Sequence, residues 1–362
     1  MGEVSSYLSG VVRLSRTRVV RWCGLITATA ICGSLLLPGV PAAASSRPTS
    51  ITLYNGQHAQ TTDAIVTAFE KSTGITVKVR SGTEDTLVNQ IATEGPRSPA
   101  DVIYTENSPA LEFLQDRALL AKVEPTTLSH TRRQYDSSKD EWVGVSARVS
   151  VIIYNPSLIS KRQLPRSVLQ LADAKYRGKL AFAAAETDFQ PIITAVDRAY
   201  GTAETLKWLK GIKANVAGHT YTSNETISSQ VNRGAVAFGV INQYYWYRLR
   251  AEIGASHMHS RITYFSAHNP GYVIDVSGAG ILKSSAHKKA AQRFLAFLVS
   301  KTAQEIIANP SRSVSYEYPI DSGITTMAPE TPFDQLRPYP ITVGELGDGS
   351  TAVSLLRQAG FL

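Results

Sequence analysis

Two adjacent tyrosines, Tyr244 and Tyr245, are the residues of this sequence best placed to do chemistry together. They lie in the stretch Asn-Gln-Tyr-Tyr-Trp-Tyr at residues 242–247, directly after an apolar, β-like run at residues 235–241. Neighbouring side chains of a regular strand point to opposite faces, so both phenols serve one site only if the chain leaves strand geometry here. A strand-to-helix turn would let both oxygens converge, which suits a hard, highly charged cation such as Fe3+. The alternative is a tyrosine-rich edge that packs and hydrogen-bonds.

A histidine and a glutamate follow two other strand candidates. His58 comes just after residues 51–54, and Glu106 comes just after residues 101–104. In open parallel sheets the ligand crevice lies outside the carboxyl ends of the strands, so both side chains are expected on one rim. Each has a plainer alternative. His58 could cap the following helix or lie at the surface, and Glu106 could be a solvated acid or pair with Arg97.

Strand and helix patterns alternate through the chain. In the first part, helix patterns separate three strand candidates; the helices are at residues 61–72, 84–93 and 108–115, and the strands at residues 51–54, 75–79 and 101–104. This spacing predicts parallel strands that are covered by helices and connected by right-handed crossovers. A long strand at residues 143–155 leads into a second α/β unit, which contains a short strand at residues 179–182. Residues 274–282 have the pattern of a return strand.

We therefore predict an α/β protein with two lobes and a ligand cleft between them, each lobe a mostly parallel sheet flanked by helices. Lobe 1 would comprise residues 51–148 and 276–316, and lobe 2 residues 149–275 and 317–362. Residues 1–44 would form a signal peptide.

The first part of the chain has the pattern of an export signal. Arginines precede an apolar run at residues 22–40, and small residues at Ala42 and Ala44 fit cleavage after Ala44; a transmembrane anchor is the alternative. Both cysteines, Cys23 and Cys32, lie in this leader, so the exported chain would have no disulfide and no thiolate ligand. The formal net charge is +8, but the basic residues are scattered rather than clustered, which argues against nucleic-acid binding.

Three segments together resemble those of the bacterial periplasmic ferric-ion-binding proteins, the substrate-binding components of iron ABC importers with a type II periplasmic-binding-protein fold. In chain order they are Tyr-Asn-Gly-Gln-His, Arg-Ser-Pro-Ala-Asp-Val-Ile-Tyr-Thr-Glu and Ile-Asn-Gln-Tyr-Tyr-Trp. The similarity covers about residues 51–316. It implies that Fe3+ is the transported ligand and that the metal ligands are His58, Glu106, Tyr244 and Tyr245.

One loop departs from the pattern of the family. Its members often complete the coordination with an exogenous anion, held by a Ser-Gly-Ala-type loop and by asparagines, whose positions Asn224 and Asn242 match. Here the loop reads Ala-Glu-Thr-Asp-Phe, and its two carboxylates would repel an anion. We hypothesise that Asp188 or Glu186 replaces the anion, with Arg148 offsetting the extra negative charge. The alternative is that both acids cap the following helix and favour its dipole.

The sequence therefore predicts a non-enzymatic, exported binding protein that captures ferric iron and delivers it to the permease of an ABC importer. It would act as a monomer, in the periplasm or on the outer side of the cell envelope, without a nucleic-acid partner. One alternative keeps the fold but binds an organic ligand, such as thiamine, a polyamine or a phosphonate, without metal. A more distant alternative is a secreted hydrolase that uses Glu106 and Asp188 as paired carboxylates.

Overall fold

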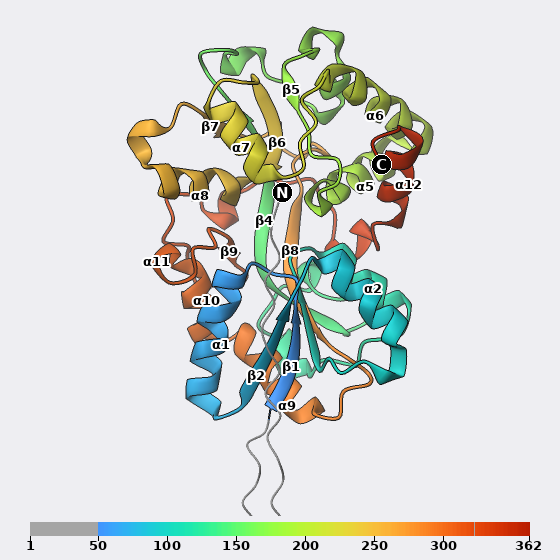
Figure 1. Ribbon diagram of the computed structural model, residues 1–362, viewed down its shortest axis with the longest axis vertical. Coiled ribbons are helices and arrows are strands. Elements are labelled where there is room, and N and C mark those ends of the chain that lie inside the picture. Colours follow the sequence, from blue (N-terminus) through green and yellow to red (C-terminus); the bar gives the residue numbers. More distant parts are fainter. Residues whose placement is uncertain (1–49, 322) are drawn as a thin grey trace, which may run out of the picture. The chain divides into compact units, whose positions relative to one another are not determined.

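Two long antiparallel strands, β4 (Trp142–Tyr154) and β8 (Ile274–Ile281), connect the two halves of the fold (Figure 1). The computed structural model describes residues 50–321 and 323–362; the predicted leader and its cleavage after Ala44 lie outside these residues. No helix in the described ranges combines the length and the apolar character needed to cross a membrane.

The remaining strands and the helices are short to medium in length. The strands are β1 (Ser50–Asn55), β2 (Thr76–Ser81), β3 (Val102–Thr105), β5 (Leu180–Ala181), β6 (Phe238–Asn242), β7 (Arg261–Thr263) and β9 (Tyr318–Pro319). The helices are α1 (Ala59–Thr73), α2 (Glu84–Glu94), α3 (Ser108–Asp116), α4 (Pro125–Leu128), α5 (Gln190–Tyr200), α6 (Thr202–Val216), α7 (Asn224–Asn232), α8 (Gln243–Ile253), α9 (Lys288–Leu298), α10 (Lys301–Ala308), α11 (Pro310–Ser313) and α12 (Ser350–Gln358).

The strands of the described chain form one continuous sheet in the order β2-β1-β3-β8-β4-β6-β5, with β7 and β9 also paired to β4. The pairs β1–β2, β1–β3 and β5–β6 are parallel, as the alternation of strands and helices predicts. The pairs that involve β4 or β8 are antiparallel. The central part of the sheet is antiparallel because β4 carries the chain out of the first half and β8 returns it in the opposite direction.

The predicted crossing strand and its return are both confirmed. β4 begins one residue before the predicted range, and all 13 of its residues are buried. A strand that is covered on both faces has no exposed side, so its sequence is a nearly continuous apolar run. Arg148 is the one charged residue of β4, and its guanidinium is fully buried.

The chain leaves strand geometry where the tyrosine pair begins. β6 ends at Asn242 and α8 begins at Gln243, so both tyrosines fall in the first turn of a helix. The predicted strand-to-helix turn is therefore confirmed. β5 is shorter than the predicted strand at residues 179–182, because Phe182 only forms an isolated bridge, with Thr220.

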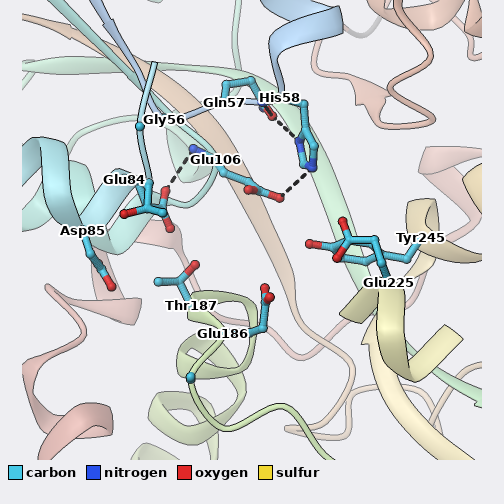
Figure 2. Close-up of a pocket in the computed structure, with 13 residues that line it drawn as sticks. Gly56, Gln57, His58, Glu84, Asp85, Glu106, Glu186, Thr187, Glu225 and Tyr245 are labelled. Carbon is cyan, nitrogen blue, oxygen red and sulfur yellow. Dashed lines mark hydrogen bonds and ion pairs between the residues drawn. The ribbon is translucent and has the colours of Figure 1, made fainter. Parts of the chain in front are cut away.

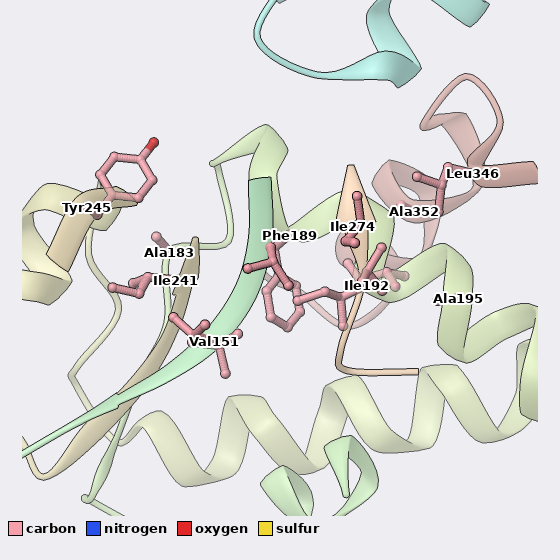
Figure 3. Packing of buried hydrophobic residues seen from close by; sticks show 14 of the residues in the cluster. Val151, Ala183, Phe189, Ile192, Ala195, Ile241, Tyr245, Ile274, Leu346 and Ala352 are labelled. Atoms are coloured by element: carbon pink, nitrogen blue, oxygen red, sulfur yellow. The ribbon is translucent and has the colours of Figure 1, made fainter. Parts of the chain in front are cut away.

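Apolar side chains from several elements pack around β4 in the second half of the fold (Figure 3). Tyr245 belongs to this cluster, and Figure 3 shows its hydroxyl pointing away from the aliphatic side chains. Phe189, directly after Asp188, packs edge-to-face on Phe182 with ring centroids 4.3 Å apart. The core therefore anchors both the helix that carries the tyrosines and the loop that carries Asp188.

The end of the chain packs against the second half of the fold. α12 contacts α5 and α6, whereas α9 and α10 pack with α1 in the first half (Figure 1). The lobe boundaries given above stay a prediction.

Candidate metal centre

The loops that follow β1 and β3 place His58 and Glu106 at the same edge of the sheet. β1 ends at Asn55, which pairs in register with Tyr104 of β3. His58 lies in the turn before α1, and Glu106 directly follows β3. Because the carboxyl ends of neighbouring parallel strands meet at one edge, both side chains reach the same cavity (Figure 2).

The tyrosine pair approaches this cavity from the other half of the fold. Tyr244 is 0% exposed and Tyr245 is 4% exposed. Their ring centroids are 4.1 Å apart and their planes are inclined by 33°. Successive side chains of a helix are separated by roughly 100° around its axis rather than 180°, so both rings can face one side.

Three of the four predicted ligand side chains are in contact. The Tyr244 hydroxyl donates a hydrogen bond to Glu106 Oε1, and His58 Nε2 lies 3.6 Å from the same oxygen. The rings of His58 and Tyr244 have centroids 5.5 Å apart. Tyr245 lines the cavity across from His58 (Figure 2). The structure thus places His58, Glu106 and Tyr245 in the wall of one cavity and Tyr244 directly against two of them, and their role as metal ligands stays a prediction.

The plainer roles considered for His58 and Glu106 are not the ones that they take. His58 is the N-cap residue of α1, but its side chain makes no capping hydrogen bond; its Nδ1 lies 2.7 Å from Gln57 Oε1 instead. Glu106 contacts Tyr244 and His58 rather than Arg97. In the described part of the chain, no three histidine, cysteine, aspartate or glutamate side chains form a metal-binding group, so this centre relies on the tyrosines.

The cavity has a volume of about 510 Å³ and an acidic wall. Its lining includes five carboxyl groups, those of Glu84, Asp85, Glu106, Glu186 and Glu225. None of the described residues that line it is a lysine or an arginine. Figure 2 shows these acids arriving from separate segments on opposite sides of the cavity. Burial raises the pKa of Glu84 to about 7 and that of Glu186 to about 8, so the wall offers carboxyl oxygens from which an arriving cation can displace protons.

Burial controls the protonation of the two phenols. Desolvation raises the pKa values of Tyr244 and Tyr245 well above their usual range, and the Asp188 carboxylate raises both further. Without a cation nearby, both phenols therefore keep their protons at neutral pH.

The pKa values of Glu106 and His58 are also displaced. Desolvation and the Asp188 carboxylate raise the pKa of Glu106 well above its usual range. Desolvation, followed by the positive charges of Arg248 and Arg148, lowers the pKa of His58 well below its usual range. The imidazole is therefore neutral, which is the form that binds a metal.

The two acids of the departing loop lie in different environments. Asp188 is 7% exposed, and its carboxylate accepts hydrogen bonds from Asn107 Nδ2 (3.2 Å) and Asn224 Nδ2 (2.8 Å). Glu186 lines the cavity, where burial and then Asp188 raise its pKa to about 8. Neither side chain caps the helix that follows: Glu186 makes no capping hydrogen bond, and those of Asp188 go to asparagine amides. The predicted capping hydrogen bonds are therefore absent, whereas a favourable effect of the two acids on the helix dipole stays a prediction.

The asparagines near the loop hold a carboxylate of the chain itself. Asn224, one of the two predicted from the sequence, donates to Asp188 Oδ2. Asn242 lines a small cavity together with Asp188 and Asn224. Asn107, which was not predicted, donates to Asp188 and also to Glu84 Oε1 at 3.0 Å. Amides that could hold an exogenous anion are thus occupied by Asp188.

Two arginines flank the ring of Tyr244. The guanidinium carbon lies 5.6 Å from the ring centroid in Arg148 and 4.6 Å in Arg248. Both charges lower the pKa of Tyr244, opposing the larger effect of burial and favouring a phenolate. Arg148, predicted to offset negative charge, forms a buried ion pair with Glu317 (3.0 Å) and donates to Asn107 Oδ1 (3.2 Å).

Several residues of this site were not predicted from the sequence; they are Gln57, Glu84, Asn107, Arg248 and Glu317. Gln57 and Asn107 directly adjoin two predicted ligands, and adjacency was an available signal for them. Glu317 lies more than 200 residues from His58 in the sequence, and no local pattern marks it.

Two α/β halves, joined by crossing strands around a polar ligand cavity, define a periplasmic-type binding protein. A family model for bacterial extracellular solute-binding proteins matches residues 64–319. The chain belongs to this family.

Relatives and solved structures agree with this assignment. The chain is 35% identical over 333 residues to the Fe(3+)-binding periplasmic protein of Serratia marcescens, covering 92% of this chain and 97% of that protein. It is 35% identical over 327 residues to a major ferric iron-binding protein of Neisseria meningitidis, covering 90% and 97%. The crystal structure of iron-bound HitA from Pseudomonas aeruginosa matches with a TM-score of 0.81 at 42% identity, covering 86% of this chain and 100% of that chain. The predicted two-lobed α/β fold and the resemblance read from three motifs are both confirmed.

The buried ion pair behind the cavity gives a stability prediction. Glu317→Gln leaves Arg148 buried without a counterion, and we expect it to lower the free energy of unfolding by about 3–5 kcal/mol. Glu305→Gln is the control, because Glu305 and Lys301 form an exposed pair at 3.8 Å whose loss should cost less than about 1 kcal/mol. Urea denaturation of both variants measures the difference, and equal small losses would contradict the structural role of Glu317.

Proposed function

We propose that this chain is an exported substrate-binding protein that captures ferric iron in the acidic cavity and delivers it to the permease of an ABC importer. One observation carries the proposal: His58, Glu106 and Tyr244 meet at one point, and Tyr245 faces the same cavity. The relatives named for ferric iron support the same cargo.

The donor atoms of these four side chains suit Fe3+. Ferric ion is small and hard, and it prefers charged oxygen ligands with an imidazole tolerated. Two phenolates and one carboxylate would supply three negative charges to balance its three positive ones. Because the ligands come from both halves of the fold, a bound ion would hold the halves together, and a permease could recognise that closed form.

We also propose that Asp188 takes the place of an exogenous anion, either as a ligand or through a water molecule. Its carboxylate is held by Asn107 and Asn224, and its charge acts on both phenols. The guanidinium of Arg148 is close enough to share in balancing this charge. A further anion such as phosphate would find the amides of Asn107 and Asn224 already bonded to the Asp188 carboxylate.

The remaining parts of the proposal rest on the family and on the sequence. Solute-binding relatives support a protein without catalytic activity. Periplasmic relatives and the leader pattern support export, with cleavage near Ala44. We expect a monomer whose macromolecular partner is the permease and which does not bind nucleic acid.

A polyamine is the second candidate ligand. Five carboxyl groups line the cavity, and they could pair with several ammonium groups of one extended molecule. The same acids disfavour a phosphonate. A hydrolase that uses Glu106 and Asp188 has no support in the geometry, because both oxygens of Asp188 accept hydrogen bonds from buried amides.

The tyrosine pair gives the direct test of the function. Adding ferric salt to the purified protein should produce a visible phenolate-to-iron charge-transfer band. Tyr244→Phe combined with Tyr245→Phe should abolish the band and weaken ferric binding by more than about 100-fold. Losing a residue that only supports a ligand costs up to about 100-fold, and this variant loses two ligands themselves. Chelator competition and absorption spectra measure both effects.

Tyr247→Phe is the matched control, because the Tyr247 hydroxyl donates to Pro329 O and does not face the cavity. It should keep both the colour and the affinity. A wild-type protein that stays colourless with iron but binds spermidine would replace the ferric proposal with the polyamine one.

Replacing Asp188 tests the internal substitute for the anion. Wild-type ferric affinity should be the same with and without phosphate. Asp188→Ala frees the amides of Asn107 and Asn224, so affinity should fall about 10–100-fold and then recover partly when phosphate is added. Glu186→Gln, at the wall of the same cavity, should stay independent of phosphate. Unchanged affinity and continued independence of phosphate in Asp188→Ala would reject this role.

Ferric binding is expected to weaken in acid. Burial raises the pKa values of Tyr244, Tyr245 and Glu106, so the metal-free site holds protons that Fe3+ must displace. Each displaced proton lowers the apparent affinity about tenfold for each unit by which the pH falls, and three displaced protons therefore give about a thousandfold. Calorimetry in buffers of different ionisation enthalpy counts the released protons. Binding without proton release would contradict phenolate ligation.

A further inference from the structure

A series of hydrogen-bonded, buried polar groups lies on the Nδ1 side of His58, away from the cavity. Gln57 is buried, and its Oε1 accepts hydrogen bonds from the His58 backbone N–H and faces His58 Nδ1, each at 2.7 Å. On its other side, Gln57 Nε2 donates to Ser277 Oγ at 2.8 Å and to Glu317 Oε2 at 3.4 Å. Ser277 and Glu317 are both fully buried.

The orientation of the Gln57 amide follows from whether each of its partners can donate or accept a hydrogen bond. The backbone N–H of His58 can only donate, so the amide atom that faces it must be the oxygen. The carboxylate of Glu317, paired with Arg148, accepts, so the atom that faces it must be the nitrogen. Reversing the amide would place two donors against each other at one end and two acceptors at the other.

This orientation determines which nitrogen of His58 carries the proton. Nδ1 faces an oxygen that can only accept, so Nδ1 is protonated in the neutral ring. Glu317 Oε1, 3.9 Å from Nδ1, adds a second negative partner on the same side. Nε2 is left with its lone pair, and it points toward Glu106 and the cavity (Figure 2).

We propose that Gln57 is a positioning residue that holds His58 as the Nδ1–H tautomer, with Ser277 and Glu317 fixing the Gln57 amide, so that Nε2 is free to bind a cation. The inference deepens the proposed function and rests on it for the identity of the cation. The tautomer itself is a property of the metal-free protein. The arrangement links a ligand that follows β1 to β8 through Ser277 and to the segment before β9 through Glu317.

The same anchor also reaches the second predicted ligand. Glu317 pairs with Arg148, and Arg148 donates to the side chain of Asn107, the residue after Glu106. The Glu317–Arg148 pair thus contacts both Gln57, which faces His58, and Asn107, which follows Glu106. This is the arrangement by which outer partners of a metal centre set tautomer and ring orientation.

Nuclear magnetic resonance of the purified, metal-free protein with 15N-labelled histidine tests the tautomer. At pH 8 the wild-type His58 ring should show a protonated Nδ1 and an unprotonated Nε2, with its signals assigned by their loss in His58→Gln. Gln57→Met keeps the size of the side chain but removes the acceptor, and it should shift His58 toward the Nε2–H tautomer that unrestrained histidine favours. Gln163→Met, at an exposed glutamine whose side chain bonds only to Ser160 of its own turn, is the control and should leave the His58 tautomer unchanged.

A second arm measures ferric affinity by chelator competition. Gln57→Met should bind iron about 10–100-fold more weakly while keeping the phenolate charge-transfer band, because both tyrosines remain. If Gln57→Met does not fold, Ser277→Ala provides the smaller perturbation: it removes one of the two groups that hold the Gln57 amide and should give a partial shift in the same direction.

The possible outcomes separate this proposal from the proposed function. A wild-type His58 protonated at Nε2, or a tautomer that is unchanged in both Gln57→Met and Ser277→Ala, would overturn the positioning role. A tautomer that shifts as expected in a protein that never binds iron would support the positioning role and reject ferric iron as the cargo.

Discussion

The cost of burying ionisable oxygen atoms is the constraint on which the rest of this site depends. Tyr244, Tyr245 and Glu106 all have raised pKa values, chiefly because water is excluded from them. An uncompensated buried charge costs several kcal/mol, so these groups keep their protons until a positive charge arrives. A trivalent cation can balance the three negative charges left when all three protons are lost. A monovalent or divalent ion balances fewer of them. On the ferric proposal, a preference of the cavity for a highly charged ion would begin with desolvation.

Other ionisable groups in this region have fixed partners. Arg148 and Glu317 neutralise each other, and Asp188 is held by two amides. Arg148 belongs to β4, and Glu317 lies just before β9, which pairs with β4 at Ser146 and Ala147. Arg148 is thus built into a strand that connects the two halves of the fold, and Glu317 is held beside that strand. A change in how the halves close would move these supports together with the predicted ligands.

Much of this arrangement was predictable from local patterns in the sequence. The alternation of strands and helices predicted the α/β fold, and the rule that ligands gather at strand ends placed His58 and Glu106 on one rim. The position of β8 between β3 and β4 was not predictable, because periodicity carries no information on which strands are neighbours. The residues that hold the predicted ligands in place could not be predicted from local patterns either. Glu186 and Asp188 are equivalent in the sequence, and only amides from residues 36 and 81 positions away from Asp188 distinguish them.

The loop that contains Asp188, which differs from the family pattern, changes whether the site needs an anion from solution. An asparagine amide can donate equally well to a free anion or to a carboxylate of the chain. A tethered carboxylate has already lost most of its translational freedom, so it occupies that place without depending on the concentration of anions outside. On the proposal made for Asp188, capture of iron would then not vary with external phosphate. The same tether means that this negative charge cannot leave when the iron is released. Release would have to come from protonation of the ligands or from separation of the two halves, where Glu106 and Tyr244 now meet.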